Sequence, residues 1–155
     1  MSLKAEHQIS LDALESALRN AQEPSLDLLM QIQGSVCTRI LHLAKTETID
    51  RLFHLAKIGA WTDAALALIE LELPFWRVRR LAYENGEWLC SLSRRPNLPI
   101  SFDDCAEATH EVLPLAILCA FVQACRRRHA MQRSVSTVPH MQPWPAQIIC
   151  CENYR

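Results

Sequence analysis

The sequence predicts an α+β fold in which N-terminal helices precede a layered core made of a helix, an antiparallel hairpin and a second helix. Three observations lead to this prediction. Residues 1–73 carry apolar side chains at helical spacing, Asn85-Gly86 separates two strand-like segments, and the apolar run from Val112 to Ala124 has the character of a buried helix. Since the chain has 155 residues, half of them hydrophobic, we expect a single globular core.

The expected domain covers residues 1–130, with a helical layer over 1–60 and the helix–hairpin–helix core over 61–130. Residues 131–155 contain three prolines, no glycine and no clear period, which predicts an extended or partly disordered tail.

The first half of the chain is expected to form successive helices. Ser10 can cap the first of them, because its hydroxyl can accept a backbone N–H of the first turn. A second helix is predicted over residues 26–44, with a bend at Gly34. A third should end at Gly59, since glycine readily adopts the positive φ of a helix C-cap, and Thr62 is the expected N-cap of the next helix.

A hairpin is the strongest local signal. Asn-Gly suits a two-residue turn in which both central residues have positive φ, and it predicts strands over residues 75–83 and 88–93. In the predicted register, three pairs share one mostly apolar face: Tyr83 with Trp88, Leu81 with Cys90, and Arg79 with Leu92.

The region after the hairpin is expected to lead into the last helix. Residues 95–99 form a proline-containing loop, and the acidic stretch Asp103 to Glu111 precedes a helix that continues to about Arg128. Arg126, Arg127 and Arg128 are explained by the favourable interaction of cations with a helix C-terminus.

The composition of the chain predicts the cellular compartment. The net charge is −1, residues 1–14 lack the apolar core of a signal peptide, and the most apolar stretch is shorter than the roughly 20 residues that span a bilayer. Seven cysteines in such a chain indicate reduced thiols rather than a disulfide framework. We therefore expect a cytoplasmic protein that does not contact a membrane.

The common nucleotide-binding and hydrolase motifs are excluded. The chain has only three glycines, at positions 34, 59 and 86, whereas a phosphate-binding loop, a dinucleotide fingerprint and a nucleophile elbow each require clustered glycines. No cofactor is expected.

Two pairs of residues are candidates for chemistry. Cys105 and His110, with Asp103 and Asp104 nearby, are the residue types of a cysteine nucleophile and its base, although a loop thiol beside helix-capping carboxylates explains them as well. Cys125 and His129 are four residues apart on one predicted helix and are candidate metal ligands, although zinc requires more than two, and a buried thiol next to a solvated imidazole is the simpler interpretation.

Arginines on and after the hairpin form the best candidate for a functional patch. Together with the interspersed aromatic residues Trp76, Tyr83 and Trp88 they are typical of a nucleic-acid-binding surface, and a solvated strand face is the alternative. The patch consists of Arg77, Arg79, Arg80, Arg94 and Arg95.

The stretch from Ala64 to Ala124 resembles the small phage ABA-sandwich domains in the order and spacing of its segments. A helix runs into Phe75-Trp76-Arg77-Val78, a hairpin returns through Glu87-Trp88-Leu89-Cys90, and a loop leads to Leu113-Pro114-Leu115-Ala116-Ile117-Leu118-Cys119-Ala120. The resemblance covers about 60 residues and implies a helix–sheet–helix layering and a phage or mobile-element origin. It implies no catalytic residues.

The leading functional hypothesis is a non-catalytic interaction or regulatory protein that binds a protein partner or itself. It follows from the missing enzyme motifs and from a hairpin whose edge must be covered, because a lone hairpin is only marginally stable in water. The alternatives are a nucleic-acid-binding protein that uses the arginine patch and a cysteine-dependent enzyme that uses Cys105 and His110.

Overall fold

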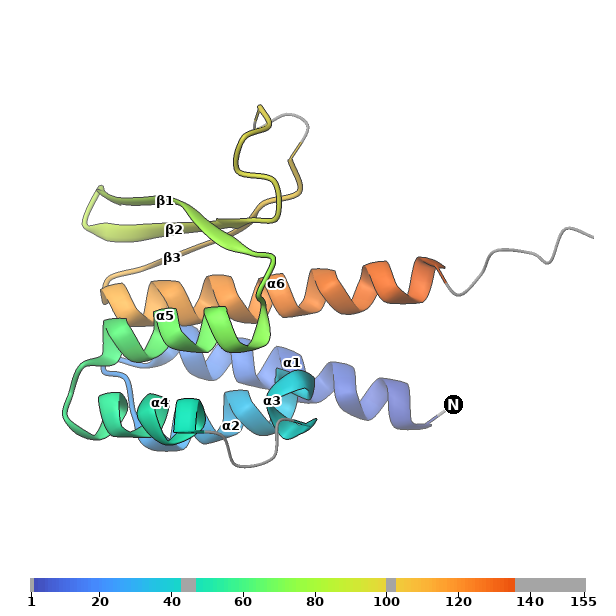
Figure 1. Cartoon of the computed structure of the whole chain (residues 1–155), viewed down its shortest axis with the longest axis horizontal. Coiled ribbons are helices and arrows are strands. Elements are labelled where there is room, and N and C mark those ends of the chain that lie inside the picture. Colours follow the sequence, from blue (N-terminus) through green and yellow to red (C-terminus); the bar gives the residue numbers. More distant parts are fainter. Residues whose placement is uncertain (1, 43–46, 100–102, 136–155) are drawn as a thin grey trace, which may run out of the picture.

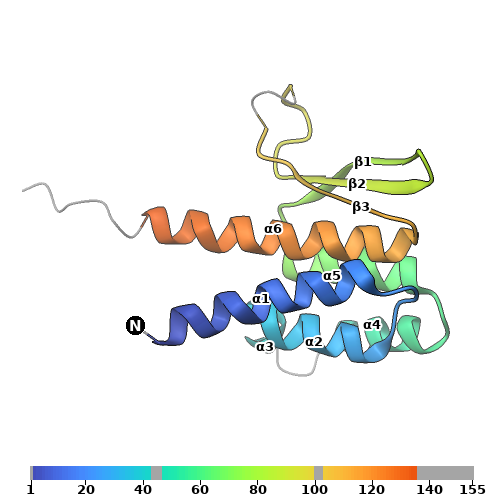
Figure 2. The same ribbon diagram turned by 180° about the vertical axis from the view of Figure 1, so that it is seen from behind.

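The computed structural model describes residues 2–42, 47–99 and 103–135 of the chain. A three-stranded antiparallel sheet forms one layer, α5 and α6 lie beneath it, and α1 to α4 lie below these (Figure 1). The view from behind shows the same order of layers (Figure 2). The elements follow one another as α1 (Ser2–Asn20), α2 (Leu26–Val36), α3 (Thr38–His42), α4 (Glu47–Lys57), α5 (Trp61–Glu72), β1 (Arg77–Glu84), β2 (Glu87–Ser93), β3 (Ala106–His110) and α6 (Leu113–Val135).

The predicted α+β class is therefore confirmed, including the N-terminal helices that precede a helix–hairpin–helix core. Both helices of that core lie on the same face of the sheet (Figures 1 and 2), whereas the resemblance to ABA-sandwich domains implies a sheet between helices.

Helix α1 begins earlier than predicted. Ser10 lies inside it rather than at its N-cap, so that prediction is wrong. The apolar stripe is as expected: Leu11, Leu14 and Leu18 are all buried. Helix α2 has the side-chain cap that is predicted for α1, because the hydroxyl of Ser25 accepts the N–H of Leu28 at 3.3 Å.

The single helix predicted over residues 26–44 is divided in two. Gly34 stays within α2, and the break comes at Cys37, after which α3 begins. The carboxylate of Glu72, at the end of α5, accepts the N–H groups of Arg39 at 3.1 Å and Ile40 at 2.9 Å. A carboxylate that satisfies the free amides of a helix start stabilises that start. Residues 43–46 lie outside the described part of the chain.

Gly59 ends α4 as predicted. Its φ is +82°, and the N–H of Ala60 reaches the carbonyl of Leu55 at 2.9 Å, the pattern of a glycine C-cap. Helix α5 follows at once from Trp61, and Ala60 at its N-cap makes no side-chain hydrogen bond. The prediction that Thr62 caps this helix is therefore wrong.

The hairpin has the predicted turn. Asn85 and Gly86 have φ of +55° and +90°, and Tyr83 faces Trp88 while Leu81 faces Cys90. The predicted pairing of Arg79 with Leu92 is wrong, because a bulge between Val78 and Arg80 places Val78 opposite Leu92.

A third strand completes the sheet in the region that is predicted only to lead into a helix. β3 pairs with β2 in antiparallel fashion, with Ala108 opposite Cys90 and Ala106 opposite Leu92. Helix α6 then starts at Leu113, and Pro114 fits its first turn, where a missing N–H costs no intrahelical bond.

Helix α6 continues to Val135 rather than ending near Arg128. The tail prediction is therefore wrong for residues 131–135, and residues 136–155 lie outside the described part. The three arginines lie well inside the helix, so a helix terminus does not explain them. Instead each pairs with carboxylates of another segment: Arg126 with Asp12 and Glu15, Arg127 with Asp104, and Arg128 with Glu72.

The hydrophobic core lies between the sheet and the helices and is centred on α6. Helix α6 supplies the most completely buried side chains and contacts the sheet on one side and the N-terminal helices on the other. Over the described residues, no helix combines the length and apolar character that crossing a membrane requires.

Candidate interaction surface

Most arginines of the predicted patch form ion pairs or hydrogen bonds within the protein. Arg79, at the bulge, pairs with Asp103 and donates to the carbonyl of Leu98 at 2.7 Å. Arg80 pairs with Glu84 on the same strand. Arg77 donates to the carbonyls of Pro74 and Trp76 at 2.9 and 3.0 Å.

Arg94 and Arg95 lie beyond the end of β2. Arg94 reaches the sulfur of Met131 at 3.5 Å, and neither arginine pairs with a carboxylate of the described residues. Thus two of the five cations are neutralised by carboxylates, and Arg77 directs its donors to nearby backbone carbonyls. Nucleic-acid binding by this patch stays a prediction.

Asp103 links the beginning of β1 to the end of β2. Its side chain is 3% exposed and accepts hydrogen bonds from Ser93, Arg79 and Cys105. The hydrogen bond from Ser93 has the largest effect and, with those from Cys105 and Arg79, lowers the pKa of the Asp103 carboxyl below its usual value. This carboxylate anchors β1 at its bulge.

Cys105 and His110 are not brought together. They lie at opposite ends of β3, about 17 Å apart along a strand of this length. The Cys105 sulfur donates to Asp103 at 3.2 Å, and burial followed by this hydrogen bond raises the pKa of the thiol. His110 is buried, and its Nδ1 accepts the N–H of Val112 at 2.9 Å. A thiol held protonated and distant from an imidazole lacks the arrangement of a nucleophile and its base.

Cys125 and His129 lie one turn apart on α6, as predicted. Cys125 is fully buried, and burial raises the pKa of its thiol to about 12, which opposes the thiolate form that binds metals. Within the described ranges, no three His, Cys, Asp or Glu side chains form a group that could hold a metal ion.

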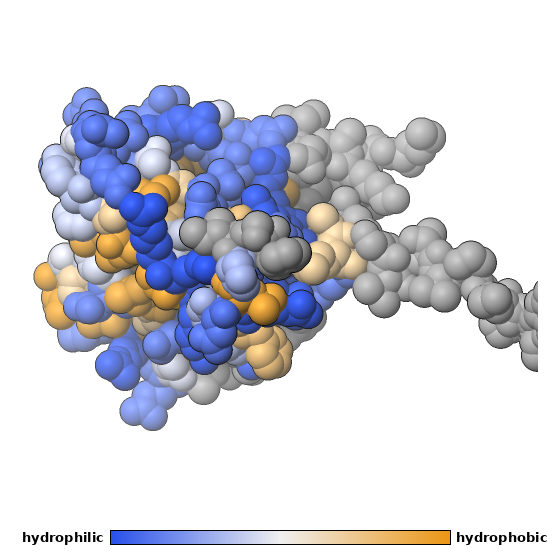
Figure 3. All heavy atoms as spheres, turned by 90° about the horizontal axis from the view of Figure 1, so that it is seen from above, coloured by the Kyte–Doolittle hydropathy of each residue, from blue (hydrophilic) through white to orange (hydrophobic). Residues whose placement is uncertain are grey.

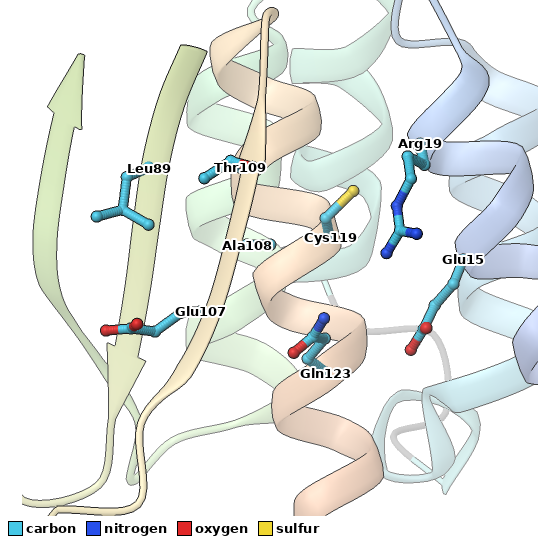
Figure 4. Close-up of a pocket in the computed structure, with 8 residues that line it drawn as sticks. All are labelled: Glu15, Arg19, Leu89, Glu107, Ala108, Thr109, Cys119 and Gln123. Atoms are coloured by element: carbon cyan, nitrogen blue, oxygen red, sulfur yellow. The ribbon is translucent and has the colours of Figure 1, made fainter. Parts of the chain in front are cut away.

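A groove of about 390 Å³ separates α1 from β3 and has α6 as its floor (Figure 4). Glu15 and Arg19 of α1 line one side, and Glu107 and Thr109 of β3 line the other. Cys119 lies on the floor, where burial raises the pKa of its thiol to about 11. The groove therefore combines side chains of both charges with a thiol whose pKa is raised.

A second hollow, of about 410 Å³, lies between α3, residues 73–76 and α6. In its charged floor, Glu72 accepts from Arg128 and from two backbone amides of α3. The terminal nitrogens of Arg128 are bonded within the protein, whereas its buried Nε has no hydrogen-bond partner among the described residues.

The outer strand of the sheet presents the most distinctive surface. β1 pairs only with β2, and its other side faces no strand of the described chain. Val78, Leu81 and Tyr83 are 38, 42 and 60% exposed, although the facing Cys90 and Leu92 of β2 are fully buried. In Figure 3, hydrophobic surface gathers on the side where the hairpin lies in Figure 1, beside a band of hydrophilic residues.

The backbone of β1 is also open. A two-residue turn makes Glu84 and Glu87 a hydrogen-bonded pair, and such pairs alternate along the hairpin. The N–H and C=O groups of Leu81 and Tyr83 must therefore point away from β2. We call these backbone groups, with the side chains of Val78, Leu81 and Tyr83, the β1 edge.

Sequence reasoning finds part of this surface. The alternation around Asn85-Gly86 correctly places Leu81 and Tyr83 on one face with Cys90 and Trp88. The ring centroid of Tyr83 lies 5.1 Å from that of Trp88, but Tyr83 is mostly exposed. Trp88 does pack against the core.

Comparisons with protein-family models, with curated proteins and with solved structures find no match to this chain. The resemblance to phage ABA-sandwich domains stays a prediction.

Proposed function

We propose that this chain is a non-catalytic interaction protein that binds an extended strand along the β1 edge. The observation that carries the proposal is that one outer strand has both backbone groups that pair with no strand of the described residues and the exposed side chains of Val78, Leu81 and Tyr83. Sheet edges of this kind accept a further strand through main-chain hydrogen bonds, while alternate side chains provide specificity.

The surroundings of β1 favour this function over catalysis. The hairpin turn fixes the direction of the outward backbone groups, and the Arg79–Asp103 ion pair holds the beginning of the strand. The edge is thus ordered before a partner arrives, which lowers the entropy cost of binding. The candidate thiols, in contrast, are buried or held protonated.

Site-specific photo-crosslinking tests the proposal. A benzophenone amino acid replaces Tyr83 in one variant and Met30 in a matched control, because Met30 is a similarly exposed apolar residue on α2. The proteins are irradiated in the cells that naturally produce them. We expect covalent adducts from position 83 in excess of those from position 30, and equal yields from both positions would contradict the proposal.

A further inference from the structure

We propose that the strand accepted by the β1 edge is β1 of a second copy of this chain, paired antiparallel about a two-fold axis at Ala82. This inference rests on the proposed function and names its partner. The two three-stranded sheets then join into one continuous sheet.

The hairpin geometry restricts the register. Leu81 and Tyr83 carry the outward backbone groups, so they must form the hydrogen-bonded pairs of any added antiparallel strand. With the axis at Ala82, Leu81 pairs with the partner's Tyr83 and Tyr83 with the partner's Leu81. These pairs also place the exposed apolar side chains of the two copies side by side.

The charges of β1 select this register among those allowed. With the axis at Ala82, Arg80 stands opposite the partner's Glu84, and Glu84 opposite the partner's Arg80. A shift of the axis to Leu81 or Tyr83 removes both opposite-charge pairs and places Ala82 opposite one of the charges instead. Within one chain Arg80 and Glu84 pair with each other, and their side chains are 54 and 52% exposed, so pairing across the axis exchanges the intrachain partner for the partner's residue.

The two edges of the sheet differ in their surroundings, and the proposed dimer uses the β1 edge. On β3 only Glu107 and Thr109 direct backbone groups outward, and Glu15 and Arg19 of α1 stand across the groove from them. A two-fold pairing through β1 uses the same surface on both copies, so this interface is complete with two chains.

Cysteine crosslinking tests the register. Residues that face each other in a non-hydrogen-bonded antiparallel pair have Cα atoms about 4.5 Å apart, within the range that a disulfide spans. In a background with Cys105, Cys150 and Cys151 changed to Ser, Ala82→Cys is expected to form a disulfide-linked dimer under mild oxidation.

Arg80→Cys in the same background is the matched control. In the proposed register, two copies of residue 80 lie four residues out of alignment, about 13 Å apart, and cannot crosslink. A mixture of the Arg80→Cys and Glu84→Cys proteins should crosslink again. Crosslinking of Ala82→Cys no greater than that of Arg80→Cys would overturn the proposal.

Charge exchange provides a test without added thiols. Arg80→Glu and Glu84→Arg each create two like-charge pairs across the axis, so each should weaken dimerisation about tenfold in sedimentation equilibrium. The double variant Arg80→Glu/Glu84→Arg restores opposite charges and should return the dimer to near wild-type affinity. A double variant no better than the single variants contradicts the register.

Different results would contradict the proposed partner and the proposed binding of a strand at the β1 edge. A monomeric chain whose position 83 captures a different protein would overturn the second copy as partner and leave strand binding at the β1 edge supported. Failure to capture any chain from position 83, with a monomeric protein, would overturn both.

Discussion

The two edges of the sheet differ in what supports them. β3 lies over α6 and beside the groove formed with α1, and its inward residues Ala106 and His110 are buried. β1 lies beyond the reach of the helices, so its inward residues Leu81 and Tyr83 remain exposed. The same alternation of inward and outward residues thus gives a buried face at one edge and an exposed apolar face at the other.

β1 is held by other means. A glycine-containing turn fixes one end, and at the other end Arg79 bonds to Asp103 and Leu98, which lie between β2 and β3 in the chain. An edge strand that is ordered without burial keeps its backbone groups available, whereas natural proteins usually shield such edges. Substitutions in the two strands can therefore distinguish stabilisation of β3 by burial from stabilisation of β1 by its turn and its ion pair.

The largest effect is expected from placing a charge on the inward face of each edge strand. Ala106 is fully buried, so Ala106→Asp buries a carboxylate without a partner and should lower the free energy of unfolding by at least about 3 kcal/mol. Leu81→Asp should cost about 1 kcal/mol or less, because Leu81 is 42% exposed. Urea denaturation measures both, and equal losses would remove the distinction between the edges.

An intermediate effect is expected from the anchor of β1. Asp103→Asn weakens the contacts with Arg79, Ser93 and Cys105, and should lower the urea midpoint at neutral pH. Because the folded-state pKa of Asp103 is depressed, its contribution is present above the unfolded value near 3.8 and is lost as pH falls through the folded value. The difference from wild type should therefore shrink below about pH 4.

Asp104→Asn is the matched control for this anchor. Asp104 pairs with Arg127 at an exposed position, and exposed ion pairs contribute little to stability. A loss equal to that of Asp103→Asn, or a loss for Asp103→Asn that grows on acidification, would contradict the assigned role of Asp103.

A smaller effect is expected at the turn. Gly86 has φ +90° and no atom within 4 Å of the position that a Cβ would take, so Gly86→Ala should cost about 1 kcal/mol through backbone strain alone. Gly34, in α2, has equally open space but helical backbone, and Gly34→Ala should stabilise by about 0.5 to 1 kcal/mol. Thermal or urea unfolding compares the two, and a stabilising Gly86→Ala would show that the turn does not fix β1.

The parts of the fold with local signals were predictable. Asn85-Gly86 specified the hairpin and two of its three proposed pairs, and Gly59 specified the end of α4. The errors came from contacts between distant segments. The bulge at Arg79 accompanies an ion pair with Asp103, 24 residues away, and the break after α2 accompanies hydrogen bonds to Glu72.

β3 was missed although a signal was present. Ala106, Ala108 and His110 alternate with Glu107 and Thr109, but alanine and glutamate have low strand propensity and the adjacent acidic residues favour the approach to a helix. These residues form a strand because they pair with β2, and the sequence of a single segment does not show which other segment it pairs with. The exposure of Tyr83 was likewise unpredictable, because it depends on how far α6 extends beneath the sheet.

The most direct test of binding at the β1 edge is amide hydrogen exchange, measured by NMR at several protein concentrations. The N–H groups of Leu81 and Tyr83 point outward from β1, and those of Glu107 and Thr109 point outward from β3. We predict that protection of Leu81 and Tyr83 rises with concentration while exchange at Glu107 and Thr109 does not change. Concentration-independent exchange at Leu81 and Tyr83, or increased protection at Glu107 and Thr109 instead, would contradict pairing of two copies through β1.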